Sequence, residues 1–79
     1  MEVVVFAYEY PNERNRAFKV LESCKTLEQL TIARNYFTAL KNKWIGATSK
    51  NKTINMLVWV DEQQFLSNLR NKEIALSVN

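Results

Sequence analysis

Residues 26–46 read TLEQLTIARNYFTALKNKWIG, and this stretch decides the fold. Its apolar residues recur every three or four positions, which places them on one face of a helix at 100° per residue. Thr26 can cap the first turn, and Gln29 stands where a capping-box partner reaches back. Gly46 follows the last apolar residue and can close the helix in a left-handed turn. We therefore predict a long central helix over residues 27–44, whose inner face consists of Leu27, Leu30, Ala33, Phe37, Leu40 and Trp44. Ile32 and Tyr36 widen this face, so we expect the helix to be covered on more than one side.

Segments rich in branched and aromatic residues predict strands on either side of this helix. Residues 2–10 contain VVVFAY and stop at Pro11, which cannot donate to a sheet ladder. Residues 53–60, TINMLVWV, would place alternate side chains on opposite faces of a strand. Residues 73–78 also alternate, and they form either a third strand, which we favour, or a helical extension.

Two shorter segments complete the expected architecture. Residues 13–23 form either a helix capped by Asn12 or, over residues 16–21, a strand paired with the first one. Asp61 is expected to cap a short helix, with Gln64 in the capping-box position. The sequence thus predicts an α+β fold in a single domain over residues 1–79. In this small two-layer domain, two to three strands pack on a long central helix and one or two shorter helices.

Composition points to a protein of a reducing compartment. The chain has a single cysteine, Cys24, so it cannot form an internal disulfide, and small secreted proteins usually carry several. No basic region precedes an apolar run at the N-terminus, so we expect no signal peptide. The apolar runs are far shorter than the ~20 residues of a membrane helix. We expect a soluble cytoplasmic protein that makes no membrane contact.

The chain lacks the residues of the common catalytic sites. It has no histidine, which removes the commonest general base and metal ligand, and with one cysteine no ordinary zinc site can form. Gly46 is the only glycine, so there is no phosphate-binding loop. We interpret Asp61 and Glu62 as a helix cap and first-turn charge, and Cys24 as a packing residue. We predict no enzyme, no catalytic residues, no metal and no cofactor.

The net charge of +3 is unevenly distributed. No acidic residue lies between Glu28 and Asp61, whereas this span holds Arg34, Lys41, Lys43, Lys50 and Lys52. These residues are either a solvated basic face or an anion-binding patch in which lysines hold phosphates while Tyr36 or Trp44 stacks on a base. The patch has a single arginine, although bidentate phosphate recognition prefers arginine over lysine.

The aromatic residues divide into core and surface candidates. Periodicity places Phe6, Phe37, Trp44 and Phe65 in the core. Trp59 lies next to Leu57 on the face of the predicted sheet that points away from the helices. There it either packs under a helix or forms an exposed apolar patch of the kind that marks partner surfaces. We take Leu57, Trp59 and Tyr36 as candidate partner-binding residues.

Residues 22–44, ESCKTLEQLTIARNYFTALKNKW, resemble a segment of short early or accessory proteins of large tailed bacteriophages. The shared features are a Cys-x-Thr-x-x-Gln-Leu start at Cys24, a paired aromatic at Tyr36 and Phe37, and a basic helix end. The resemblance implies a small non-enzymatic protein that binds and inhibits a host or anti-phage defence protein in the bacterial cytoplasm, as anti-CRISPR and anti-restriction proteins do. It carries over no catalytic residues.

Two functions therefore remain open from the sequence. The first is a protein-binding inhibitor that acts by occlusion, although the basic chain disfavours simple DNA mimicry. The second is a small RNA- or DNA-binding protein that uses the basic patch described above. A homodimer is compatible with either, because edge strands and surplus apolar surface invite one.

Overall fold

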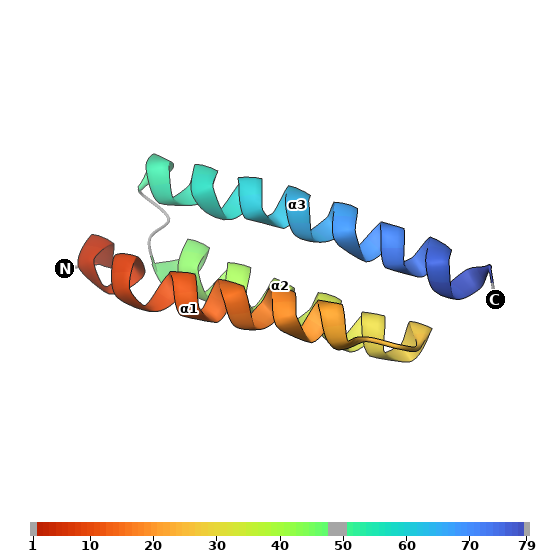
Figure 1. Ribbon diagram of the computed structural model, residues 1–79. Coiled ribbons are helices and arrows are strands. Elements are labelled where there is room, and N and C mark those ends of the chain that lie inside the picture. The colour runs from red at the N-terminus through yellow and green to blue at the C-terminus, as the bar shows by residue number, and fades with distance from the viewer. Residues whose placement is uncertain (1, 48–50, 79) are drawn as a thin grey trace.

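The protein is a bundle of three helices (Figure 1). The computed structural model describes residues 2–47 and 51–78, and in this part α1 spans Glu2–Ser23, α2 spans Leu27–Ala47 and α3 spans Lys52–Ser77. Helices α1 and α3 run in the same direction, and α2 runs back (Figure 1). The principal extents are 47 × 17 × 15 Å. Residues 2–47 and 51–78 contain no strand, so the predicted α+β fold, with its two-layer arrangement, is wrong.

Helix α2 confirms the predicted central helix. The amide of Gln29 donates to Thr26 Oγ1 at 3.2 Å, and Gln29 Oε1 accepts from the amide of Lys25 at 2.6 Å, one residue before the cap. The prediction for Gly46 is wrong, because this residue lies inside α2 and its φ is not positive. On the inner face Leu30, Ala33, Phe37, Leu40 and Trp44 are buried, whereas Leu27, Ile32 and Tyr36 are exposed, so the helix is covered on one side only.

Helix α1 joins the predicted first strand and the ambiguous segment 13–23 into one helix with Pro11 inside it. Phe6, Tyr10, Ala17 and Leu21 are buried at spacings of four, seven and four, which put them on one helical face. A β-branched residue costs only about 0.5 kcal/mol in a helix, whereas burying a large apolar side chain gains about 1.5–3 kcal/mol. Core packing therefore outweighs the strand preference of the valines at residues 3–5, and neither Asn12 nor Pro11 marks a boundary.

Helix α3 joins three segments that the sequence analysis separated: the strand at 53–60, the short helix after Asp61 and the strand at 73–78. It begins at Asn51, whose Oδ1 accepts from the amide of Ile54 at 3.1 Å. Asp61 is not a cap, since it lies in the middle of α3. The buried residues are again spaced by four, seven and four, at Ile54, Val58, Phe65 and Leu69.

Aromatic rings fill the core in two groups. Near the start of α1, Phe6 stacks on Tyr10 with ring centroids 4.5 Å apart, and Trp44 meets both rings edge-on. In the middle of the bundle, Phe37 stacks on Phe65 at 4.6 Å, and Phe18 meets both edge-on, so this group joins all three helices. The predicted burial of Phe6, Phe37, Trp44 and Phe65 is confirmed.

The turn between α1 and α2 is held from α3. The Lys72 ammonium group donates to the backbone carbonyl of Glu22 and, at 2.9 Å, to that of Cys24. The last carbonyls of a helix lack intrahelical partners, and a lysine there also complements the negative end of the helix dipole. Lys72 thus fixes the end of α1 against α3.

Candidate protein-binding surfaces

Residues 56–60, in the second and third turns of α3, are apolar on every side of the helix. Ile54 and Val58 face the core, while Met56, Leu57, Trp59 and Val60 are between 49% and 66% exposed. A helix segment that is apolar on every side is usually covered on every side. These side chains therefore form the main candidate for a binding surface in the described part of the chain.

Leu57 and Trp59 point to opposite flanks of α3. Leu57 lies one turn before Asp61, whose carboxylate accepts from Tyr10 at 2.7 Å and pairs with Arg14 at 3.0 Å, both on α1. Trp59 lies three residues before Glu62, whose carboxylate pairs with Lys41 of α2 at 2.9 Å. Residues three or four apart share a helix face, so Leu57 lies on the α1 side and Trp59 on the α2 side.

Trp59 is exposed and does not pack under a helix, but it lies on a helix and not on a sheet, and it forms no common patch with Leu57. Lys52, Trp59 and Leu66 are spaced by seven residues and therefore lie along one line of α3. Lys52 is exposed and Leu66 is half-buried. The ion pair between Lys41 and Glu62 borders this line, and we call these five residues the Trp59 surface.

The third candidate, Tyr36, belongs to another part of the molecule. It lines a shallow hollow of about 330 Å³ between α1 and α2, together with Glu13, Arg16, Ala39, Leu40 and Lys43. The structure therefore does not bring Tyr36 together with Leu57 and Trp59, and the three candidate residues do not form one surface.

The predicted basic patch is dispersed. Lys41 and Lys43 are two residues apart, so they leave α2 in nearly opposite directions. Lys41 pairs with Glu62 of α3, and Lys43 pairs with Glu13 of α1 at 2.6 Å. Arg34 lines a separate hollow of about 260 Å³ between α2 and α3. Lys52 is exposed, and Lys50 lies outside the described residues.

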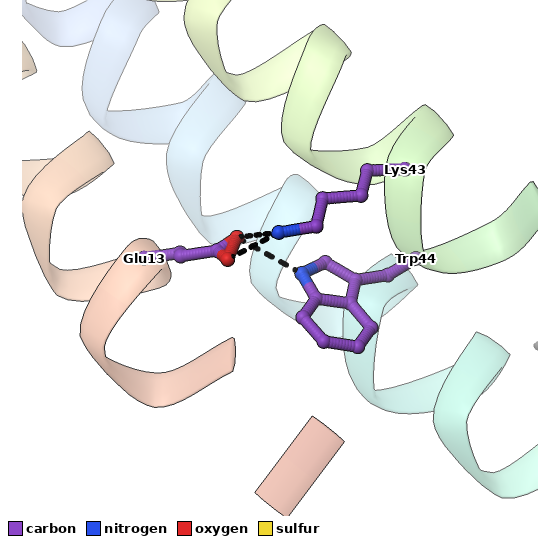
Figure 2. A network of polar contacts seen from close by, with 3 residues as sticks. All are labelled: Glu13, Lys43 and Trp44. Carbon is purple, nitrogen blue, oxygen red and sulfur yellow. Dashed lines mark hydrogen bonds and ion pairs between the residues drawn. The ribbon is translucent and has the colours of Figure 1, made fainter. Parts of the chain in front are cut away.

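Glu13 connects α1 to α2 through two donors (Figure 2). Its carboxylate accepts from Lys43 Nζ at 2.6 and 3.1 Å and from Trp44 Nε1 at 3.2 Å. The hydrogen bond to Glu13 raises the pKa of Lys43, desolvation opposes this, and the charges of Glu13 and Glu9 add to it. Lys43 Nζ also lies 4.9 Å from the centre of the Trp44 ring. Because the indole of Trp44 is buried, the main effect of Glu13 is to satisfy that N–H donor.

The residues considered for catalysis have structural partners. Asp61 and Glu62 bind groups on different helices, as described above, so they do not act together on one point in space. Cys24 is buried, and its thiol donates to the carbonyl of Val20 at 3.2 Å. Among residues 2–47 and 51–78, no cluster of three His, Cys, Asp or Glu side chains could hold a metal ion.

None of the helices formed by the described residues is both long and apolar enough to cross a bilayer. No protein-family model matches the chain, and comparison with curated proteins and with solved structures gives no significant match.

Sequence reasoning missed further exposed apolar residues. Val4 and Tyr8 on α1 are exposed, as are Met56 and Val60 on α3. If residues 2–10 are taken as a helix, Val4 and Tyr8 are predicted to be exposed, because they lie opposite Phe6 and Tyr10 at 100° per residue. The density of branched residues concealed this signal by favouring a strand.

Proposed function

We propose that this chain is a non-enzymatic protein-binding module whose contact surface is centred on Trp59. The observation that supports this most is that Trp59 is 58% exposed beside a charged pair and a lysine. Tryptophan is enriched among residues that dominate binding energy, particularly where a rim of polar groups can exclude water. In the free chain this large ring is not part of the core, so most of its apolar surface is available to a partner.

The partner class follows from the resemblance to bacteriophage proteins. We propose that the chain binds a host or anti-phage defence protein in the bacterial cytoplasm and inhibits it by occlusion. Occlusion needs only a stable contact that blocks the partner's working surface, and a rigid bundle with an anchoring ring can provide one. This part of the proposal depends on the sequence of residues 22–44 alone.

Nucleic-acid binding through the basic patch stays a prediction with less support. Two of its lysines, Lys41 and Lys43, are engaged by carboxylates, which reduces the positive potential that they offer to phosphate groups. Arg34 and Lys52 remain as candidate phosphate contacts. Such binding would weaken steeply as the salt concentration rises.

The test is capture of a partner from bacterial lysate by immobilised wild-type chain, Trp59→Ser and Ile74→Ser, with and without nuclease. Ile74 is a matched control, since it is 55% exposed on the same helix but lies four turns further along. Loss of a hot-spot residue costs about 2 kcal/mol or more, so we expect Trp59→Ser to weaken capture at least about 30-fold. Ile74→Ser should capture as the wild type does.

Circular dichroism and thermal unfolding of each variant verify the fold. Equal capture by Trp59→Ser and wild type would contradict the proposed surface. Capture that nuclease abolishes, and that Arg34→Glu with Lys52→Glu also abolishes, would support the nucleic-acid alternative instead. The captured protein is identified by mass spectrometry, and loss of its activity on adding the chain tests the inhibition.

A further inference from the structure

A second exposed surface lies across α1 and α3. It consists of Val4 and Tyr8 on α1 and of Met56, Leu57 and Val60 on α3, and we call it the outer strip. Leu57 lies on the α1 side of α3, as shown above. Val60, three residues after Leu57, and Met56, four residues before Val60, lie progressively further round the helix from α1. Both helices begin at the same end of the bundle, so the two halves of the strip lie at that end (Figure 1).

The seam between α1 and α3 is open beneath this strip. Ala7 lies two turns before Arg14 and so faces α3, yet it is exposed. The first polar link across the seam from this end is the bond between Tyr10 and Asp61. Helix α2 packs along both other helices, whereas α1 and α3 touch each other less. A neighbour could therefore cover the strip without displacing any helix.

The area of the outer strip matches one side of a small dimer interface. Its five side chains are 49–77% exposed, and only Tyr8 is aromatic, with a whole side-chain area of roughly 150–250 Å². The four aliphatic side chains offer about 60–120 Å² each, from about 1.5–3 kcal/mol of burial at about 25 cal/mol/Å², so the exposed apolar area is on the order of 250–450 Å². A weak interface buries less than about 600 Å² per partner, of which about 65% is apolar in homodimers, so up to about 400 Å² is needed. The chain exposes 5707 Å², whereas a monomer of 9.3 kDa is expected to expose about 5,000 Å².

The charge of the strip favours a second copy as its occupant. Its five residues are uncharged, and so are residues 3–8 of α1 and 53–60 of α3 that surround them. An uncharged apolar surface is complementary to itself, whereas it offers no charge pattern that would select a charged partner. We propose that the outer strip binds the outer strip of a second copy, forming a two-fold symmetric homodimer.

In this dimer Trp59 lies at the edge of the interface and not within it, because Met56 is three residues before it but Trp59 itself lies on the α2 side of α3. Each dimer then carries two Trp59 surfaces. The dimer does not depend on the function proposed for Trp59, and either conclusion can fail without the other. Of the two grounds that the sequence offered for a homodimer, edge strands are absent from the described residues, and surplus apolar surface remains.

Sedimentation equilibrium of the full chain tests this proposal, at concentrations from about 1 to 500 µM, a range suited to the weak binding of a small interface. We expect a mass twice the 9.3 kDa of the monomer at the upper end. The double variant Leu57→Ser, Val60→Ser should dimerise at least about tenfold more weakly, since both side chains are half-exposed in the monomer and central in the strip. Tyr8→Ser, a single change on the other helix, should also weaken the dimer.

Two controls separate this interface from the Trp59 surface. Trp59→Ser and Ile74→Ser should dimerise as the wild type does. Raising the salt concentration should not weaken the dimer, because the contact is apolar and each copy carries a net charge of +3 that salt screens. Two results for the wild type would overturn the proposal: the mass of one monomer at every concentration, or a mass that grows beyond two copies. Two results for folded variants would also overturn it. These are unchanged dimerisation of the double variant Leu57→Ser, Val60→Ser and of Tyr8→Ser, or loss of the dimer in Trp59→Ser.

Discussion

At the scale of single residues, the phenol of Tyr10 connects burial most directly to stability. Its side chain is 4% exposed, and its hydroxyl donates to Asp61 Oδ2 at 2.7 Å. Arg14 holds the same carboxylate from the other oxygen at 3.0 Å. Burial, and then the hydrogen bond and negative charge of Asp61, raise the pKa of Tyr10 well above its usual value, while Arg14 opposes the shift.

We therefore expect Tyr10 to make the fold less stable above about pH 10. The unfolded chain releases the phenol proton near pH 10, whereas the folded chain keeps it, so the folded state binds more protons above that pH. The free energy of unfolding then falls by up to about 1.4 kcal/mol per pH unit. Below pH 10 both states hold the proton and the full contribution is present.

Urea unfolding at about pH 9 and pH 11, which bracket the ordinary tyrosine pKa, measures this effect. Other side chains also change charge over this pH range, so the result is the difference between variants. Tyr10→Phe should lose less stability than wild type between the two pH values. Tyr8→Phe, which changes an exposed tyrosine two residues earlier, should behave as wild type. Equal slopes for Tyr10→Phe and wild type would show that the phenol is not held as described.

Residue-scale predictions from the sequence succeeded where one strong period was present. The buried positions of α2 followed from spacing, although Leu27, predicted with them, is exposed. The cap at Thr26 followed from its hydroxyl and from Gln29 three residues later. Asp61 was misread because an acidic residue followed by Gln64 is a legitimate capping signal. Its actual partners, Tyr10 and Arg14, are about 50 residues away in the chain, and no local pattern contains that information.

At the scale of elements, α1 carries a proline where a helix least tolerates one. Pro11 is the tenth residue of α1 and is exposed. It lacks the N–H that would bond to the carbonyl of Ala7. Proline inside a helix costs about 3 kcal/mol relative to alanine. The core contacts of Phe6 and Tyr10 on one side and of Ala17 and Leu21 on the other hold the helix together across it.

Pro11→Ala should therefore stabilise the protein by about 1–3 kcal/mol, because it restores the missing hydrogen bond and relieves the steric conflict. The measurement is the free energy of unfolding from urea titration at neutral pH. Asn12→Ala is the control, since it changes the next exposed residue and should gain only about 0.5 kcal/mol from helix propensity. If Pro11→Ala gained no more than Asn12→Ala, α1 would not be one continuous helix.

The strands predicted at 2–10 and 53–60 failed for one physical reason. In both segments the core residues follow a helical period, but exposed apolar residues stand between them and obscure it. At 73–78 only Leu76 packs against the core, so the alternation of apolar residues there did not reflect burial. Ile54 and Val58 fit both an alternating strand and a helix, and periodicity alone cannot separate these in a short run. The preference of branched residues for strands then favoured the wrong state, although tertiary packing outweighs it.

At the scale of the whole molecule, the apolar residues that obscured the fold are also those that carry the proposed contacts. Sequence patterns are expected to disagree with the fold mainly at functional or strained sites. Trp59 was identified as a candidate from its chemistry. Only the arrangement of the helices shows that it lies apart from Leu57 and Tyr36. The outer strip could not be predicted, because two of its five residues belong to the first part of α1, which was read as a strand.

The account as a whole depends on Trp59 being uncovered in the free protein and covered in a complex. Acrylamide quenching of fluorescence measures this in a Trp44→Phe variant, in which Trp59 is the only tryptophan. We predict strong quenching for the free protein, whether monomer or dimer, and markedly weaker quenching once the captured partner is bound. Weak quenching in the free protein, or quenching that a saturating partner leaves unchanged, would contradict the account.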